Sequence, residues 1–154
     1  MAHTAREELT VRLERAILAG AILPDDPVDA ENRLNELNEL ARTAGARVVG
    51  QITQQRTRAD SAYFIGKGKA DELRDLARSN KADVIIFDHD LTPGQLRNLE
   101  RATETKVVDR SELILDIFAT HARSAAAKVQ VELAQLEYSC LLYTSDAADE
   151  EDSV

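Results

Sequence analysis

Residues 84–109 read VIIFDHDLTPGQLRNLERATETKVVD, and this stretch decides the fold. It opens with a wholly apolar run, residues 84–87, which is typical of a strand covered on both faces of a sheet. Thr92, Pro93 and Gln95 then predict a helix start. Thr92 can cap the helix, Pro93 suits the first helical position, and Gln95 can reach back to complete a capping box. Lys106-Val107-Val108 is predicted to be the next strand, which ends at Asp109.

The same alternation of short strands and helices extends upstream and predicts a parallel α/β sheet with flanking helices. Strands are expected at residues 16–20, 47–53, 84–87 and 106–108. Helices are expected between them. The first can have Pro27 in its first turn, and the others are expected at about residues 70–78 and 92–101. The first of these helices has an apolar face that includes Leu34 and Leu37, and Gly45 is expected to end it.

The last element differs from the others in length. Ser111 is expected to cap it, and neither Gly nor Pro interrupts the chain from there to Tyr138. Apolar or small residues recur there at helical spacing: Ile114, Phe118, Ala122, Ala125, Val129, Leu133 and Leu136. Such a helix would be roughly 40 Å long, so we expect it to project from the sheet. No second helix remains to cover its apolar stripe, which suggests that the sequence is truncated.

These patterns predict four segments. Residues 1–14 form a lead-in, 15–110 an α/β subdomain, 111–138 the long helix, and 139–154 an acidic tail. The part from residue 141 onward contains five acids and no Lys or Arg. We interpret the tail as disordered or as an artefact of the reading frame, and favour the artefact.

Composition restricts the class of protein. Apolar residues make up 44% of the 154 residues and aromatic residues only 4%, so the core must consist of Leu, Ile, Val and Ala. Cys140 is the only cysteine, which excludes an internal disulfide and a cysteine metal cluster. The apolar runs are too short to span a membrane, and we expect a cytoplasmic protein. The net charge of −9 is concentrated in the tail, so a local basic patch can still bind RNA; no DNA partner is indicated.

One connection combines basic residues with glycines and is the candidate phosphate-binding site. Its residues are Arg56, Arg58, Gly66, Lys67, Gly68 and Lys69. A glycine-rich turn at a helix amino terminus can bind anions through free N–H groups and the helix dipole. The alternative is a tight turn whose glycines need a positive φ. The connection is not a Walker loop, because the G-x-x-x-x-G-K-[ST] spacing is missing. An RNA backbone is the preferred ligand, ahead of a nucleotide.

Other motifs favour plainer interpretations. Asn80-Lys81-Ala82-Asp83 matches the guanine-binding N-K-x-D motif, but it precedes a strand instead of following one, so we interpret it as a turn with Asn80 as helix C-cap. Asp25, Asp26 and Asp88 lie where receiver domains hold Mg²⁺ and accept phosphate, yet no fifth strand with its Lys follows. We interpret these acids as turn and cap residues. Asp88-His89-Asp90 is too compact to be a metal site by itself, so neither a metal site nor a catalytic site is predicted.

Four stretches together resemble the amino-terminal domain of HflX-type GTPases. They are YFIGKGK at residues 63–69, LTPGQLRNLE at 91–100, VDRSELILDIFA at 108–119 and KVQVELAQLEY at 128–138. Each alone is a weak signal, but together they occur in the family's order and spacing. The resemblance covers the chain from about residue 15 to residue 138.

The resemblance implies an α/β subdomain, a two-helix antiparallel arm and then a GTPase domain. Family members bind the large ribosomal subunit, and some split ribosomes. Only the first arm helix is expected here, and GTP and Mg²⁺ would belong to the missing GTPase domain. The implied role of this chain is binding of large-subunit rRNA without catalysis. The alternative is a free-standing nucleotide-sensing or receiver-like signalling module.

Overall fold

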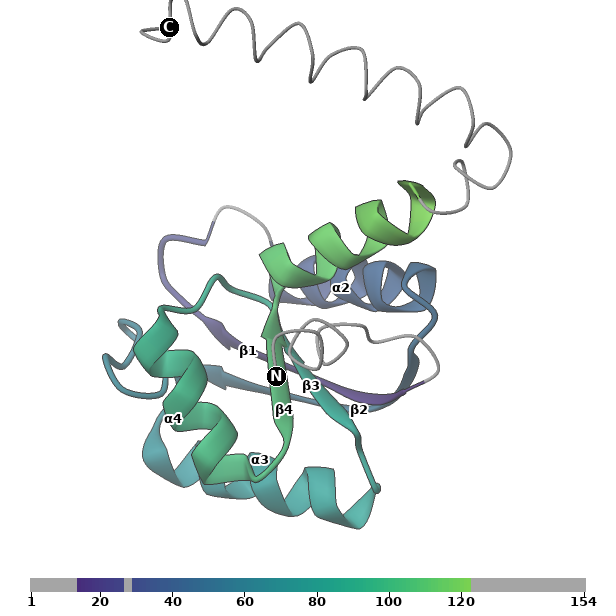
Figure 1. The fold of residues 1–154 in the computed structure, drawn as a ribbon. Coiled ribbons are helices and arrows are strands. Elements are labelled where there is room, and N and C mark those ends of the chain that lie inside the picture. The colour runs from purple at the N-terminus through teal and green to yellow at the C-terminus, as the bar shows by residue number, and fades with distance from the viewer. Residues whose placement is uncertain (1–13, 27–28, 123–154) are drawn as a thin grey trace, which may run out of the picture. The chain divides into compact units, whose positions relative to one another are not determined.

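The computed structural model describes residues 14–26 and 29–122 and contains a four-stranded sheet (Figure 1). All strands are parallel, in the order β2-β1-β3-β4. The elements are β1 (Arg15–Ile22), α2 (Ala30–Thr43), β2 (Arg47–Gln55), α3 (Lys67–Ser79), β3 (Val84–Phe87), α4 (Pro93–Thr103) and β4 (Lys106–Asp109). A further helix, without a label in Figure 1, runs from residue 110 to 122 and is called the 110–122 helix below. The predicted α/β class and parallel sheet are confirmed.

Helices cover both faces of the sheet because β1 and β3 are apolar on both sides. Side chains alternate along a strand. Ile17 and Ile85 therefore pack on one face with Leu73 of α3 and Leu99 of α4. Ala16, Leu18, Val84 and Ile86 pack on the other face, with α2 and the 110–122 helix. Figure 1 shows the two layers of helices on opposite sides of the strands.

Several predicted element ends are confirmed. Thr92 and Gln95 form the expected capping box at the start of α4. Gly45, with a φ of 92°, follows the end of α2, where a left-handed residue is needed. Asn80 is the C-cap of α3, and Asp83 Oδ2 accepts a hydrogen bond from the backbone N–H of Arg15 at 2.9 Å. The N-K-x-D match is thus a turn at the amino edge of the sheet.

Two predicted helix starts were misplaced by a few residues. Helix α3 begins at Lys67 instead of about residue 70, because Gly66 takes the N-cap position with extended backbone. The 110–122 helix is capped by Asp109 and not by Ser111. Asp109 Oδ1 accepts from the N–H of Glu112 at 2.9 Å, and Glu112 Oε1 accepts from the N–H of Asp109 at 3.3 Å. This reciprocal pair is a capping box, which an Asp can form as well as a Ser.

The strand order creates a crevice at the carboxyl edge of the sheet. The chain crosses from β1 to β2 on one side and returns past β1 to β3 on the other. Between β1 and β3 the direction of winding reverses, and ligands of open parallel sheets bind at such points. A ligand site is therefore expected at the carboxyl ends of these two strands.

The remaining expectations lie outside the described residues. These are the lead-in to residue 13, the long helix beyond residue 122 and the acidic tail. Within the part of the chain that the structure describes, no helix is long and apolar enough to cross a membrane.

A basic loop beside a buried ion-pair network

The connection from β2 to α3 is tied to its neighbours by hydrogen bonds. Asp60 pairs with Phe64 through two backbone bonds of 3.0 Å, and its carboxylate accepts from the N–H groups of Ala62 and Tyr63. Gln95 Nε2 of α4 donates to the carbonyl of Asp60 at 2.8 Å. The loop therefore has a defined shape over the start of α4.

Gly66 is the N-cap of α3 and lies beside the basic residue Arg56 of this loop. Its φ is −70°, so the interpretation that this glycine needs a positive φ is wrong. A Cβ at this position would lie 2.9 Å from a guanidinium nitrogen of Arg56 and 3.2 Å from Gln54 Nε2, so the ends of these two side chains would have to shift. The N–H of Gly66 donates to Gln54 Oε1 at 2.7 Å. Gly68, in the first turn, has open space around its Cβ position.

The first turn of α3 presents N–H groups together with two lysines. No side chain caps this helix, so the amides of Lys67, Gly68 and Lys69 have no intrahelical partner. Lys67 Nζ lies 3.3 Å from Asp71, and Lys69 Nζ lies 3.1 Å from Glu72. The structure thus groups Arg56 with residues 66–69.

Arg58 belongs to the same loop but is placed differently. Its side chain is exposed, and its carbonyl accepts a hydrogen bond from Arg56 Nε at 3.1 Å. Arg58 therefore orients Arg56 through its backbone, while its own guanidinium faces solvent.

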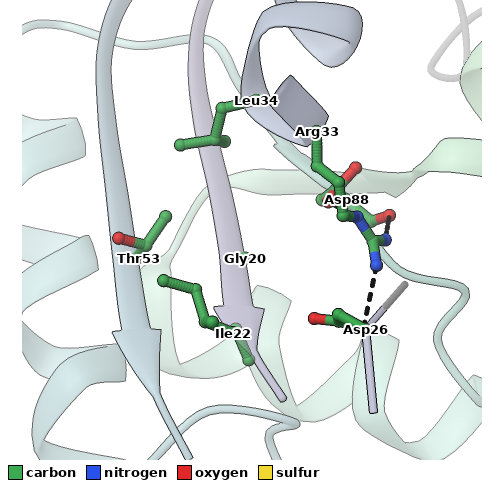
Figure 2. A pocket seen from close by; sticks show the side chains of 8 residues that line it. Gly20, Ile22, Asp26, Arg33, Leu34, Thr53 and Asp88 are labelled. Atoms are coloured by element: carbon green, nitrogen blue, oxygen red, sulfur yellow. Dashed lines mark hydrogen bonds and ion pairs between the residues drawn. The ribbon is translucent and has the colours of Figure 1, made fainter. Parts of the chain in front are cut away.

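A network of buried ion pairs, which the sequence pattern did not reveal, fills the crevice between β1 and β3. Asp88, which follows β3 and is 4% exposed, lies at its centre. Its Oδ2 accepts from Arg33 Nε of α2 at 2.8 Å, and its Oδ1 accepts from Arg110 at 2.7 Å. The same Arg33 guanidinium donates to Asp26 Oδ1 at 3.0 Å (Figure 2). Arg110 also reaches Glu36 at 3.0 Å.

The electrostatics of Arg110 follow from this arrangement. Burial by itself would lower the pKa of the Arg110 guanidinium, but its hydrogen bonds to Glu36 and Asp88 raise that pKa above the ordinary value. Arg110 is therefore bound as a cation between two carboxylates, and hydrogen bonds between charged groups are stronger than neutral ones.

The crevice next to this network is small. Its lining includes Gly20, Thr53 and Leu34 (Figure 2), and its free volume is about 10 Å³, about the space of one water. The fold brings Asp26 and Asp88 together, as the receiver-like alternative required, but Arg33 occupies the space between them. Among the described residues, no cluster of three or more His, Cys, Asp and Glu side chains could hold a metal ion.

His89 connects the network to the basic loop. Its ring stacks on Phe64 with centroids 4.6 Å apart. Its Nε2 lies 2.8 Å from the carbonyl of Ala21, and its Nδ1 lies 3.4 Å from an Arg33 nitrogen. A carbonyl only accepts and an arginine only donates, so the neutral ring protonated at Nε2 satisfies both contacts. Phe64 is held at a φ of 67°, which is unusual for an aromatic residue.

Comparison with known proteins identifies the family. Residues 31–119, more than half of the chain, match the family described as GTP-binding GTPase N-terminal. The GTPase HflX of Caldanaerobacter subterraneus is 51% identical over 132 residues, which cover 86% of this chain and 30% of that protein. The chain belongs to the HflX family of GTPases. The GTPase HflX of Escherichia coli is 44% identical over 125 residues, covering 81% of this chain and 29% of that protein.

The fold is also similar to that of solved structures. A crystal structure of an SsGBP and GDP complex superposes with a TM-score of 0.57 at 24% identity, covering 82% of this chain and 35% of that one. At this identity the likeness establishes the fold alone. The chain spans about 30% of the length of the HflX relatives that it matches.

The residues that the sequence patterns missed are Arg33, Arg110 and Gln54. Arg33 lies within the predicted amphipathic helix, but its partner Asp88 is 55 positions away in sequence. No local spacing could pair them. Arg110 was hidden in the same way, because its contact to Glu36 spans 74 positions.

Proposed function

We propose that this chain is the amino-terminal, ribosome-binding part of a cytoplasmic HflX-type GTPase. It would bind rRNA of the large ribosomal subunit and take no part in catalysis itself. Family membership supports this proposal, as does the grouping of Arg56, Lys67 and Lys69 around uncapped amides at the start of α3. The grouping is the observation that favours a phosphate-rich partner.

The chemistry of this cluster suits a phosphate group. The free N–H groups at the amino end of α3 and the helix dipole attract an anion. The ion pairs of Lys67 and Lys69 with acids on the same helix span three or four residues, and Lys67 is 62% exposed. Exposed pairs of this kind contribute little stability. A phosphate can therefore displace Asp71 or Glu72 at low cost.

The shape of the loop supports binding without a large rearrangement. Gln54 holds Gly66, and Gln95 and Asn98 of α4 hold the carbonyls of Asp60 and Ala62. A loop already ordered loses little conformational entropy when it binds. Phosphate contacts position a protein on RNA without reading sequence, so shape and backbone would be recognised here.

The test is co-sedimentation of the 154-residue chain with purified large ribosomal subunits across a salt series. We expect the double substitution Arg56→Ala with Lys67→Ala to weaken binding severalfold. Each lost phosphate contact should also reduce the slope of log affinity against log salt by about one.

The matched control is Arg42→Ala with Arg47→Ala. Both arginines are exposed, and replacing them removes the same charge as the loop variant does. They lie near the amino edge of the sheet, away from the loop. Equal binding of the loop variant and wild type across the series would contradict the assignment of the cluster. Calorimetry with ATP and GTP tests the alternative that the domain senses a nucleotide. Binding of either nucleotide, without affinity of the chain for large subunits, would favour that alternative.

A further inference from the structure

The outward face of α4 carries two arginines, Arg97 and Arg101, one helical turn apart, and both are exposed. Their positions are separated by about 6 Å along the helix axis. Neither guanidinium has a hydrogen bond or ion pair within residues 14–26 and 29–122. Like charges at this spacing repel each other, and neither arginine has a direct ionic partner among these residues to offset the repulsion.

The acids that could neutralise these arginines are engaged elsewhere. Glu100 lies three residues after Arg97, but its Oε2 accepts from the backbone N–H of Val107 at 3.1 Å. Glu104 lies three residues after Arg101, but its Oε1 accepts from Arg78 of α3 at 3.2 Å. The sequence therefore places acids at a spacing that suits ion pairs with the two arginines, but in the fold these acids bond to other groups.

Helix α3 shows the opposite arrangement. Lys67, Lys69 and Arg74 each lie within 4 Å of an acid on the same helix, at 3.3, 3.1 and 3.9 Å. The basic residues of these two neighbouring helices thus differ in whether they have an acidic partner. Of these two neighbouring helices, α3 pairs Lys67, Lys69 and Arg74 with acids, whereas α4 leaves Arg97 and Arg101 without a direct partner among the described residues.

The α4 face adjoins the basic loop. Gln95 Nε2 and Asn98 Nδ2 donate to carbonyls of that loop at 2.8 and 3.0 Å, which fixes the loop along the flank of α4 (Figure 1). An RNA strand lying on the loop would therefore continue onto the exposed side of the helix.

We propose that the outward face of α4 is a second RNA-binding surface, in which Arg97 and Arg101 contact the sugar-phosphate backbone. Guanidinium groups bind phosphate oxygens in a bidentate manner and suit this role better than lysine. The inference rests on the proposed function for the identity of the RNA, and it adds a surface that the basic loop does not include.

The test compares wild type with a double variant that carries both Arg97→Ala and Arg101→Ala. Large subunits and protein-free large-subunit rRNA are used as separate ligands. Alanine favours a helix and removes the repulsion, so the variant should fold; its thermal melt checks this. We expect about tenfold weaker binding to both ligands at low salt and a salt slope reduced by about two. The charge-preserving Arg97→Lys with Arg101→Lys should retain most of the slope, and Arg42→Ala with Arg47→Ala should match wild type.

The outcomes separate this inference from the proposed function. Unchanged binding of the α4 variant alongside weakened binding of the loop variant would overturn the inference and leave the function standing. Loss of subunit binding with unchanged binding to protein-free rRNA would also overturn it, because the partner of α4 would then be a ribosomal protein. Binding to rRNA that depends on α4, with none to subunits, would support the inference and contradict the function. No binding to either ligand would contradict both.

Discussion

Asp88 is the residue at which three parts of the chain meet. Its carboxylate binds Arg33 of α2 and Arg110 at the start of the 110–122 helix. Its backbone N–H donates to Ala19 of β1 at 2.8 Å. Gly20 is needed beside it, since a Cβ there would lie 3.2 Å from the Asp88 Cβ. Asp88 therefore determines where both helices sit on this face of the sheet.

Replacing Asp88 by Asn should destabilise the domain by about 3 kcal/mol, because it removes the buried charge that both guanidinium groups share. Arg33 would keep only Asp26 as a counter-charge, and Arg110 only the exposed Glu36. Urea unfolding monitored by circular dichroism would show this as a lower midpoint with an unchanged slope. Asp90→Asn is the control: Asp90 is exposed, and accepts a hydrogen bond from Ser111 at 2.6 Å. Equal midpoints for the two variants would show that the network does not stabilise the fold.

The helices begin at residues that satisfy their free N–H groups in different ways. Thr92 with Gln95 and Asp109 with Glu112 form capping boxes, whereas Gly66 leaves the start of α3 uncapped. Helix α2 also begins without a side-chain cap, at Asp29, but the start of α3 lies beside the basic residues Arg56, Lys67 and Lys69. This difference between elements is consistent with the proposed location of the phosphate site.

The capping box at Glu112 should make stability depend on pH. Burial raises the pKa of Glu112, the carboxylates of Asp109 and Glu100 add to the rise, and the N–H of Asp109 opposes it. A raised pKa in the folded state stabilises the fold below the ordinary value of 4.5, and this contribution is lost as the pH rises through the folded-state pKa.

Glu112→Gln cannot ionise and can still accept from Asp109. Its melting temperature relative to wild type should therefore be more favourable at neutral pH than at a pH below 4.5. Thermal melts of both proteins at the two pH values measure this difference. A relative melting temperature that rises on acidification would contradict the assignment.

For the molecule as a whole, the crevice where parallel sheets bind ligands is filled by the chain's own Arg33. Its free volume of about 10 Å³ does not accommodate a nucleotide. The exposed basic groups instead lie outside the crevice, on the loop and on α4.

The 154-residue chain should show no GTP hydrolysis, because its sequence contains no G-x-x-x-x-G-K-[ST] loop. Phosphate release by the purified chain, compared with a complete HflX relative, checks this. Turnover that follows the chain through successive purification steps would mean that a catalytic site exists here that neither sequence nor fold reveals.

Local sequence patterns determined the order, type and approximate ends of the described elements. The strand at Val84–Phe87 and the capping box at Thr92 were predicted correctly, because apolar runs and caps depend on neighbours within a few residues. Gly45 ended its helix for the same reason. The candidate phosphate residues were also visible, as a basic, glycine-rich run between a strand and a helix.

Only the tertiary structure decided which charged side chains pair with one another. Arg33 donates a hydrogen bond to Asp88, 55 positions away in sequence. Glu100 accepts from the N–H of Val107, and Glu104 accepts from Arg78. Such pairings depend on strand order and helix placement, which no local spacing contains. They neutralise the arginines of the crevice. Among the described residues they also leave Arg97 and Arg101 without a direct ionic partner, because the carboxylates of Glu100 and Glu104 bond to groups outside α4.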